Sequence, residues 1–344
     1  MHICVTGGSG FIGSHFYTEL RRLGHALTII DLVEPSAEIA ADSSVRFVQG
    51  DIRDKAKMLD AARGADAILH LAAAHHDFGI SRDEFFSVNE HGAEVICQVM
   101  DEVGVRSLCF YSSVAVYGEI AEPITEQSKP EPVSDYGQSK LAGEKVFHAW
   151  VDKAQDRTCL VIRPTVTFGV RNFANMYSLI RQIESGKFLP IGDGANIKSL
   201  SYVENIVDAT MYLWGLDDGG PRRPVGPGFH VFNYIEKPDM TSRQITAAIY
   251  ESLGRKMPGF TIPLPLAVLL GLPFDLIIKL TGKNLPVSTA RMKKLCTQTK
   301  YEADKVLAAG FQPRVTLREG IDRMVKWWMA EGRHQKPAHP GGAQ

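Results

Sequence analysis

The 344-residue sequence has few cysteines, almost no net charge and no long uninterrupted apolar run, and each lack excludes a class of protein. Its five cysteines are scattered without a CxxC pair, so we expect neither a structural zinc site nor a disulfide scaffold. A net charge of −1 does not indicate the excess of basic residues that is typical of nucleic-acid-binding proteins. The first residues, MHICVT, lack the basic and apolar regions of a secretory signal. We therefore expect a cytoplasmic protein that binds neither a metal ion nor nucleic acid.

The most apolar segment, residues 262–280, is interrupted by three prolines and by Asp275. These interruptions argue against a helix that spans a membrane. The favoured interpretation is a buried helix pair over the core or at a subunit contact. The alternative is a surface that makes weak peripheral contact with a membrane or with an apolar partner.

Short apolar runs alternate with helical patterns through the first half of the chain. The runs that we predict as strands are ICVT, HALTIID, VRFVQGD, ADAILHLAA, RSLCFYSS and TCLVIRP. Continuous apolar strands separated by helices predict a parallel sheet covered on both faces, which is a Rossmann-type doubly wound α/β fold. Ligands of such a fold bind at the carboxyl ends of the strands. After Pro164 the pattern becomes mainly helical and predicts a smaller C-terminal substrate domain.

A glycine-rich turn follows the first predicted strand and opens the first helix. In VTGGSGFIGSH, Gly7, Gly10 and Gly13 are three residues apart. Glycines at such a turn let the backbone approach a pyrophosphate, and the helix N-terminus attracts its charge. The second strand ends in Asp31, near the spacing at which a carboxylate binds an adenosine ribose. Since no arginine stands beside Asp31, the pattern favours NAD over NADP.

Two further motifs follow strands of the predicted sheet. GDIRD closes the third strand, where Asp51 and Ile52 either frame the adenine or form an ordinary turn. In SDYGQSKLAGE a helix begins, and Tyr136 and Lys140 lie four residues apart on one of its faces. A phenol ordinarily titrates near 10, and a neighbouring ammonium group lowers that pKa. The pair is therefore a candidate for proton transfer at neutral pH.

Together with HLAA (70–73), YSSVAVYG (111–118) and RPTVTFG (163–169), these motifs resemble the extended short-chain dehydrogenase/reductase family. Within it the chain resembles the NAD-dependent nucleotide-sugar epimerases and dehydratases, including the UDP-glucose 4-epimerase-like enzymes of polysaccharide biosynthesis. The resemblance implies NAD as cofactor, a nucleotide-sugar substrate and a homodimer. It implies Tyr136 as the base, Lys140 as the group that tunes it and binds the nicotinamide ribose, and Ser113 as the assisting hydroxyl that contacts the substrate, with Ser112 structural. Tyr136 and Lys140 would both contact the cofactor.

The resemblance also implies further contacts, which could instead be ordinary packing or surface positions. For the cofactor these are Phe11, Ile12, Leu71, Ala72, Ala73, Pro164 and Thr165, with Asn89 as a polar anchor; for the substrate they are Asn175, Lys198 and Arg291. We expect residues 1–170 to form the NAD-binding domain, with about 198–235 returning to it. Residues 171–197 and 236–332 would bind the substrate, and 333–344 would be a disordered tail.

The residues after Ser113 help to choose the reaction. Dehydratase relatives carry an acid pair where this chain has Val114 and Ala115, so a 4,6-dehydratase is not expected. The resemblance favours a nucleoside-diphosphate-sugar 4-epimerase that works through a 4-keto intermediate. The alternative is a reductase of a nucleotide-bound 4-keto-6-deoxy sugar. A third hypothesis, suggested by residues 262–280, is a hydroxysteroid or lipid alcohol dehydrogenase. A non-catalytic NAD-sensing protein is disfavoured because Tyr136 and Lys140 are both present.

Overall fold

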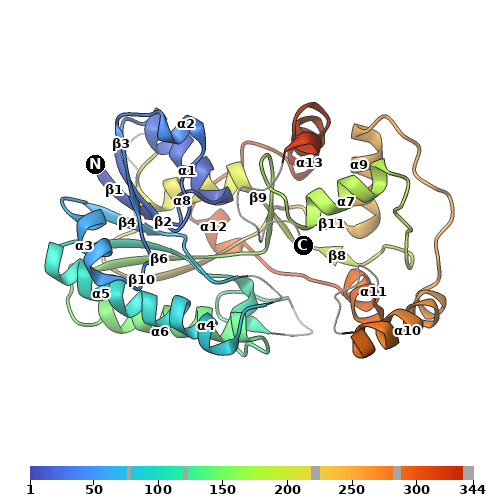
Figure 1. The fold of residues 1–344 in the computed structure, drawn as a ribbon, viewed down its shortest axis with the longest axis horizontal. Helices are drawn as coiled ribbons and strands as arrows, with labels where there is room; N and C mark the ends of the chain where they lie inside the picture. The colour runs from blue at the N-terminus through green and yellow to red at the C-terminus, as the bar shows by residue number, and fades with distance from the viewer. Residues whose placement is uncertain (76–78, 119–122, 218–224, 282–287, 336–344) are drawn as a thin grey trace.

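The computed structural model describes residues 1–75, 79–118, 123–217, 225–281 and 288–335 (Figure 1). Its N-terminal part is built on a seven-stranded sheet in the order β10–β6–β5–β4–β1–β2–β3. All neighbouring strands of this sheet run parallel. The strands are β1 (His2–Thr6), β2 (Ala26–Asp31), β3 (Val45–Gln49), β4 (Ala67–His70), β5 (Ser107–Tyr111), β6 (Thr158–Pro164) and β10 (Gly228–Tyr234).

Helices cover both faces of the sheet (Figure 1). One face packs against α1 (Phe11–Arg22), α8 (Val203–Trp214) and α12 (Asp304–Ala308), and the other against α3 (Lys55–Ala62), α5 (Gly92–Val103) and α6 (Asp135–Val151). Phe16 of α1 and Phe147 of α6 are completely buried on opposite faces. Burial of each such side chain contributes about 1.5–3 kcal/mol. The predicted doubly wound α/β fold is confirmed.

The remaining elements around the sheet are short. They are α2 (Ala37–Ala40), α4 (Arg82–Phe86), a π-helical turn η1 (Ser87–His91) and a 3-10 turn η2 (Val114–Tyr117). Helical structure from Arg82 to Val103 is divided between α4, η1 and α5. The extra residue of a π turn shifts the side chains that follow it, and such turns occur often at functional sites.

The C-terminal region has its own hydrophobic core, between α7 (Asn175–Glu184), α9 (Ser242–Ser252) and α13 (Leu317–Ala330). Both α9 and α13 begin with capping boxes, Thr241 with Gln244 and Thr316 with Glu319. The other elements are β7 (Val166–Phe168), β8 (Ile197–Lys198), β9 (Leu200–Tyr202), β11 (Met240–Thr241), α10 (Leu264–Thr281), α11 (Thr289–Cys296) and η3 (Gly332–His334). Of the expected C-terminal tail, residues 336–344 lie outside the described part of the chain.

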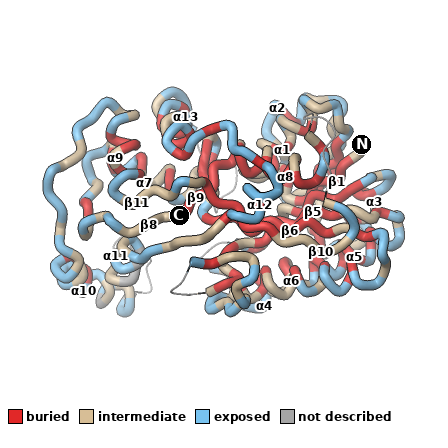
Figure 2. The backbone as a smooth tube through the Cα atoms, turned by 180° about the vertical axis from the view of Figure 1, so that it is seen from behind, coloured by how far each residue is buried: buried red, intermediate tan, exposed pale blue. Residues whose placement is uncertain are grey.

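Most of the apolar segment 262–280 forms α10, but this helix is not buried over the core as the favoured interpretation predicted. Figure 2 shows much of α10 exposed, far from the N-terminal sheet. Leu269 is 60% exposed and Leu280 is 75% exposed. Burial over the core is therefore the wrong expectation, while a subunit contact stays a prediction. Among the described residues, no helix combines the length and the apolar character needed to cross a membrane.

Candidate active site

The glycine-rich turn connects β1 to α1 and brings backbone very close to backbone. Gly7 has φ +71°, and a Cβ on it would lie 2.6 Å from the backbone nitrogen of Ala72. A Cβ on Gly13 would lie 2.5 Å from the carbonyl oxygen of Gly8. Gly10 precedes α1 and supplies no side-chain cap, so no capping side chain competes for the first N–H groups of the helix. The turn therefore forms a cradle whose N–H groups, beginning with that of Phe11, suit a phosphate.

Asp31 ends β2 directly beside this turn. Its carboxylate accepts hydrogen bonds from the N–H of Ser9 at 3.0 Å and from the N–H of Val33 at 3.2 Å. A carboxylate offers about four lone-pair sites, so about two stay available for other donors. The backbone thus holds Asp31 in a position from which it can accept bonds from two neighbouring hydroxyls of a ribose.

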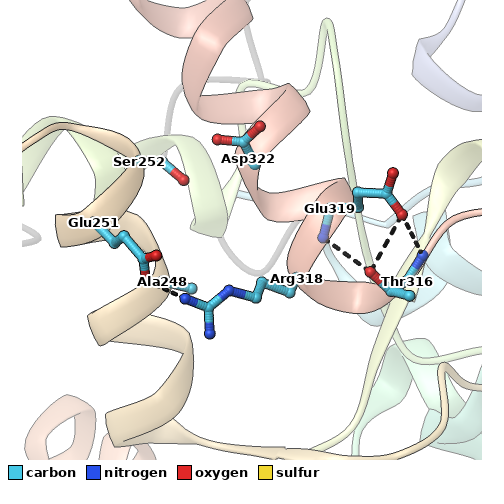
Figure 3. A pocket seen from close by; sticks show the side chains of 7 residues that line it. All are labelled: Ala248, Glu251, Ser252, Thr316, Arg318, Glu319 and Asp322. Atoms are coloured by element: carbon cyan, nitrogen blue, oxygen red, sulfur yellow. Dashed lines mark hydrogen bonds and ion pairs between the residues drawn. The ribbon is translucent and has the colours of Figure 1, made fainter.

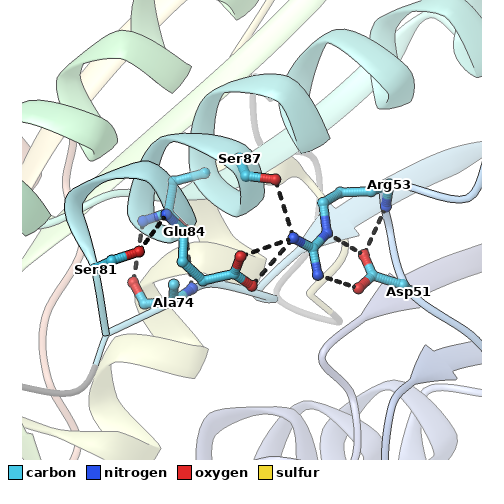
Figure 4. Close-up of polar contacts among 7 residues, drawn as sticks. Asp51, Arg53, Ala74, Ser81, Glu84 and Ser87 are labelled. Carbon is cyan, nitrogen blue, oxygen red and sulfur yellow. Dashed lines mark hydrogen bonds and ion pairs between the residues drawn. The ribbon is translucent and has the colours of Figure 1, made fainter. Parts of the chain in front are cut away.

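Asp51 follows β3 and is held by Arg53 (Figure 4). Arg53 donates from Nη2 at 2.6 Å and from Nε at 3.0 Å, and these hydrogen bonds hold the pKa of Asp51 below its ordinary value. The same guanidinium group reaches Glu84 and Ser87. The side chain of Ile52 is buried in the core. An adenine at this edge would therefore meet an oriented, ionised carboxylate.

The end of β4 closes the other side of the cradle. Both Leu71 and Ala72 donate their N–H groups to the carbonyl oxygen of Thr6, at 3.0 and 3.1 Å. The hydroxyl of Thr6 also bonds Nδ1 of the buried His70 at 2.7 Å. These bonds tie the start of the segment 71–73 to the last residue of β1. The segment predicted to line the cofactor thus lies against the glycine-rich turn.

Asn89 lies in the π turn η1 and is buried and fully bonded. Its side-chain amide exchanges two hydrogen bonds with the backbone of Ala74, each at 3.0 Å. It also donates to the hydroxyl of Ser139 on α6 at 2.9 Å. Asn89 therefore fastens the loop after β4 to the helix that carries the predicted base, which is a positioning contact.

Hydrogen bonds to neighbouring strands also hold the segment that follows β6. Pro164 is buried at the end of β6, opposite Tyr234 of β10. The hydroxyl of Thr165 lies 2.9 Å from that of Ser201, which in turn donates to the carbonyl oxygen of Tyr234. This stretch thus follows the same carboxyl edge of the sheet as Asp31.

The two serines after β5 have different surroundings. Ser112 is buried, and its hydroxyl donates to Oε1 of Glu144 at 2.5 Å. Ser113 is only partly buried, and its hydroxyl accepts from the N–H of Ala115 at 3.1 Å, which starts η2. The hydroxyl proton of Ser113 remains able to point toward a substrate. The division into a structural Ser112 and a functional Ser113 stays a prediction, in which the more deeply buried serine has the structural role.

Tyr136 and Lys140 lie on successive turns of α6, the helix capped by Ser134. Tyr136 is partly exposed in the first turn, whereas Lys140 is buried. The ammonium group of Lys140 donates to the carbonyl oxygen of Tyr111 at 2.6 Å and lies 4.6 Å from the ring centre of Phe110. Burial lowers the pKa of Lys140 from 10.5 to about 7, and the charge of Glu144 opposes this shift.

A buried ion pair beneath this site was not predicted. Arg163 of β6 and Glu144 of α6 form a two-pronged salt bridge, with each side chain at most 6% exposed. Arg163 also donates to the hydroxyl of Tyr117 at 2.7 Å, and that hydroxyl donates to Asn233 of β10 at 2.8 Å. Glu144 follows Lys140 by four residues, and this spacing is the one sequence signal that could have suggested its role.

The predicted substrate residues lie on the C-terminal region. Asn175 is exposed at the first position of α7. Lys198 belongs to β8, and its Nζ donates to the carbonyl oxygen of Thr297, just after α11, at 2.6 Å. Arg291 belongs to α11, but its side chain lies outside the described residues. The structure thus brings β8 and the end of α11 together.

A hollow between α9 and α13 contains none of these groups (Figure 3). Half of the polar residues that line it are acidic, and Arg318 there pairs with Glu251. Within the described ranges, no three His, Cys, Asp or Glu side chains gather as metal ligands. The groups that suit a dinucleotide, namely the glycine cradle, Asp31 and the turn after β4, instead meet at the carboxyl edge of the sheet.

Comparison with known proteins gives consistent matches. Residues 3–224 match the model of the NAD dependent epimerase/dehydratase family. The chain is 36% identical over 327 residues to N-acetyl-alpha-D-glucosaminyl-diphospho-ditrans,octacis-undecaprenol 4-epimerase of Escherichia coli O157:H7, and the match covers 95% of each protein. It is 28% identical to 3beta-hydroxysteroid-dehydrogenase/decarboxylase isoform 1 of Arabidopsis thaliana, over 93% of this chain and 78% of that protein.

Solved structures share the fold. The structure of UDP-glucuronic acid 4-epimerase from Bacillus cereus, in complex with NAD, superimposes with a TM-score of 0.73. The match covers 95% of this chain and 98% of that chain at 21% identity. At this identity the likeness supports the fold: a Rossmann-type sheet with a C-terminal region beside it.

Proposed function

The chain belongs to the NAD dependent epimerase/dehydratase family, and from this premise we propose that it is a 4-epimerase of a sugar carried on a diphosphate. The observation that carries the proposal is the close packing of the first turn of α6, which holds Tyr136, on the turn that begins at Ser113: a Cβ on Gly137 would lie 2.4 Å from the carbonyl oxygen of Ala115. The relative from Escherichia coli, similar over 95% of the chain, is a 4-epimerase of a diphosphate-linked sugar. Val114, which follows Ser113, has no carboxyl group to support a dehydratase.

The cofactor of the proposed reaction is NAD, held by the glycine-rich turn at its pyrophosphate and by Asp31 at its adenosine ribose. Bound there, NAD would supply the acceptor for the C4 hydride of the sugar and, in its reduced form, the donor that returns it. Asp51 and the backbone of Ile52 would face the adenine. The backbone of residues 71–73 and of Pro164 would line the nicotinamide half.

The side chains supply the proton transfers at O4. Tyr136 takes the O4 proton as the 4-keto sugar forms and returns it after the sugar has rotated to present its other face. The hydroxyl of Ser113 donates a hydrogen bond to O4 and so stabilises its charge. Lys140 lies one turn below Tyr136, and its positive charge favours the phenolate. Glu144 opposes the loss of that positive charge.

The diphosphate would be recognised on the C-terminal region. Lys198 and Arg291 are the proposed phosphate contacts, and Asn175 is a proposed sugar or carrier contact. The carrier is either a nucleoside, as in the UDP-sugar relatives, or a lipid, as in the Escherichia coli relative. A homodimer that acts in the cytoplasm in polysaccharide biosynthesis remains our expectation for the assembled protein.

One further activity is favoured by an observation. The similarity to a plant 3beta-hydroxysteroid-dehydrogenase/decarboxylase extends over 93% of the chain, and α10 is apolar and exposed. Oxidation of a lipid alcohol would use the same Ser113, Tyr136 and Lys140. The two activities differ in cofactor balance, because an epimerase returns the hydride and a dehydrogenase releases reduced NAD.

The experiment that separates them follows sugar and cofactor together. The protein with NAD is incubated with UDP-glucose, UDP-N-acetylglucosamine, polyprenyl-diphosphate N-acetylglucosamine in detergent, and a 3β-hydroxysteroid. We expect inversion at C4 of a sugar by proton NMR, with no net rise in absorbance at about 340 nm. Tyr136→Phe should remove the activity while NAD stays bound, and Tyr212→Phe, on α8 and outside the proposed site, is the matched control. Stoichiometric reduced NAD from the steroid, with no sugar inverted, would refute the epimerase.

A further inference from the structure

Helix α10 presents a continuous apolar face that no described part of the chain covers. Residues recurring at intervals of three and four share one side of a helix. Six side chains of α10 on that side are each at least 39% exposed, namely Leu266, Leu269, Leu270, Phe274, Ile277 and Leu280. Monomeric soluble proteins rarely expose so many large aliphatic groups together, and such patches mark contact surfaces.

The opposite side of α10 is the side that packs on the protein. Ala267 and Gly271 are buried, and a Cβ on Gly271 would lie 3.1 Å from Thr289 and 3.2 Å from Met292 of α11. Asp275, the only acidic residue of α10, is also turned this way, since its carboxylate accepts from the N–H and the hydroxyl of Thr289. The outer face of α10 therefore carries no carboxylate.

The charged residues of the segment that contains α10 and α11 are nearly all basic. Between residues 255 and 300 the sequence contains eight lysines or arginines and a single acidic residue, Asp275, although the whole chain has a net charge of −1. Among the described side chains, Lys256, Lys279 and Lys293 are exposed. An apolar helix face bordered by basic residues is the pattern of helices that lie in the interface of an anionic membrane. Charge complementarity thus selects a lipid surface over a second copy of this nearly neutral chain.

A short segment of chain joins the end of α11 to the candidate active site. Asn196 donates to the carbonyl oxygens of Leu295 and Thr297 at 3.0 and 3.1 Å, which fixes the end of α11. A few residues later Tyr301 packs near Tyr117 of η2, with ring centres 6.4 Å apart. The five Cα–Cα steps from Cys296 to Tyr301 span at most about 18 Å even when extended. The helix that packs against α10 therefore ends within about 18 Å of the residue that packs near Tyr117, in the turn after Ser113.

We propose that the outer face of α10 lies in the surface of an anionic membrane and holds the active site over sugar diphosphates anchored there by a lipid. This inference rests on the proposed 4-epimerase function for its substrate, while the docking itself stands on the surface of α10. The leucines and Ile277 enter the boundary between headgroups and acyl chains. The lysines remain among the headgroups, and Pro273 and Lys279 keep the helix from crossing the bilayer.

The test measures vesicle binding of the full chain with NAD, without turnover. Vesicles contain phosphatidylcholine alone or phosphatidylcholine with about one-third phosphatidylglycerol. We expect sedimentation with the anionic vesicles, weakened as salt rises from about 0.1 to 0.5 M because screening weakens the basic contacts. The double variant Leu269→Glu/Ile277→Glu should lower the partition coefficient at least about tenfold, since both positions lie at the centre of the outer face. Leu307→Glu, an exposed position of α12 (41%), is the matched control and should bind as wild type.

Unchanged thermal melting and NAD content show that the double variant is folded. The proposal is overturned if wild type ignores anionic vesicles, if Leu307→Glu loses as much binding, or if the double variant halves the mass in light scattering, which would identify a subunit contact. Epimerisation of the sugar panel is measured separately in detergent. Activity without vesicle binding overturns only the docking, and α10-dependent binding without epimerisation supports docking while refuting the proposed function.

Discussion

Replacing Lys140 by methionine should remove a specific pH dependence of stability. The pKa of Lys140 is about 7 in the folded protein because the side chain is buried, against an ordinary 10.5. Between these values the unfolded chain holds a proton that the folded chain releases, so unfolding takes up a proton. Raising the pH therefore opposes unfolding, and the contribution of Lys140 to stability rises from pH 7 toward pH 10.5. The full span of the shift corresponds to about 5 kcal/mol.

The assay is urea unfolding of NAD-free wild type and Lys140→Met at pH 7 and at pH 9. With half of Lys140 already neutral at pH 7, the free energy of unfolding of wild type should gain about 2 kcal/mol relative to the variant between these pH values. Other titrating groups are common to both proteins and cancel, as does the lost bond to the carbonyl oxygen of Tyr111. Lys145→Met, at an exposed position of the same helix, is the matched control. A difference between wild type and Lys140→Met that does not change with pH would refute the argument that Lys140 is a desolvated cation.

Three further perturbations test the site, each by turnover, NAD affinity and thermal melting. Ser113→Ala should lower kcat about 100-fold or more with little loss of stability. Ser112→Ala should lower the free energy of unfolding by about 1–3 kcal/mol, because it leaves a buried carboxylate oxygen of Glu144 without its donor. Equal effects of the two variants on kcat would contradict the assignment. Asp31→Ala should weaken NAD binding and reduce the preference for NAD over NADP. An unchanged ratio of the NAD and NADP affinities would exclude the contact between Asp31 and the ribose. Gly7→Ala should abolish NAD binding, because the added Cβ would lie 2.6 Å from the backbone nitrogen of Ala72. Gly24→Ala is the control: Gly24 has φ +78° but open space around it, so this variant measures the cost of backbone strain alone, about 1–2 kcal/mol of stability. Equal losses of stability and of NAD affinity in the two variants would argue against the close approach at Gly7.

The fold and the positions of the main site residues could be predicted because their signals are local. A buried parallel strand is apolar along its whole length, so its end can be located from the sequence to within a residue or two. Asp31, for example, is the last residue both of the apolar run and of β2. Glycines three residues apart after such a strand have few structural alternatives. Once several strand ends are located, a parallel sheet places them at one edge.

What could not be predicted depends on contacts between distant segments. The π turn that aims Asn89 at Ala74 and Ser139 has no pattern of its own in a continuous helical sequence. The exposure of α10 was missed because a run of leucines looks the same whether it is covered by the core or faces outward. Periodicity shows which residues share a face, but only tertiary packing decides what lies against that face.

The buried charges explain how one helix serves both structure and chemistry. Lys140 and Glu144 are both buried on α6, and Arg163 of β6 neutralises Glu144 through two hydrogen bonds. Without Arg163 the carboxylate would be an isolated buried charge, which is far more costly than a paired one. The negative charge of Glu144 also acts on Lys140, where it opposes the desolvation that lowers the pKa of the lysine. The ion pair thus fastens α6 to the sheet and, through the same carboxylate, favours the charged form of the lysine below Tyr136.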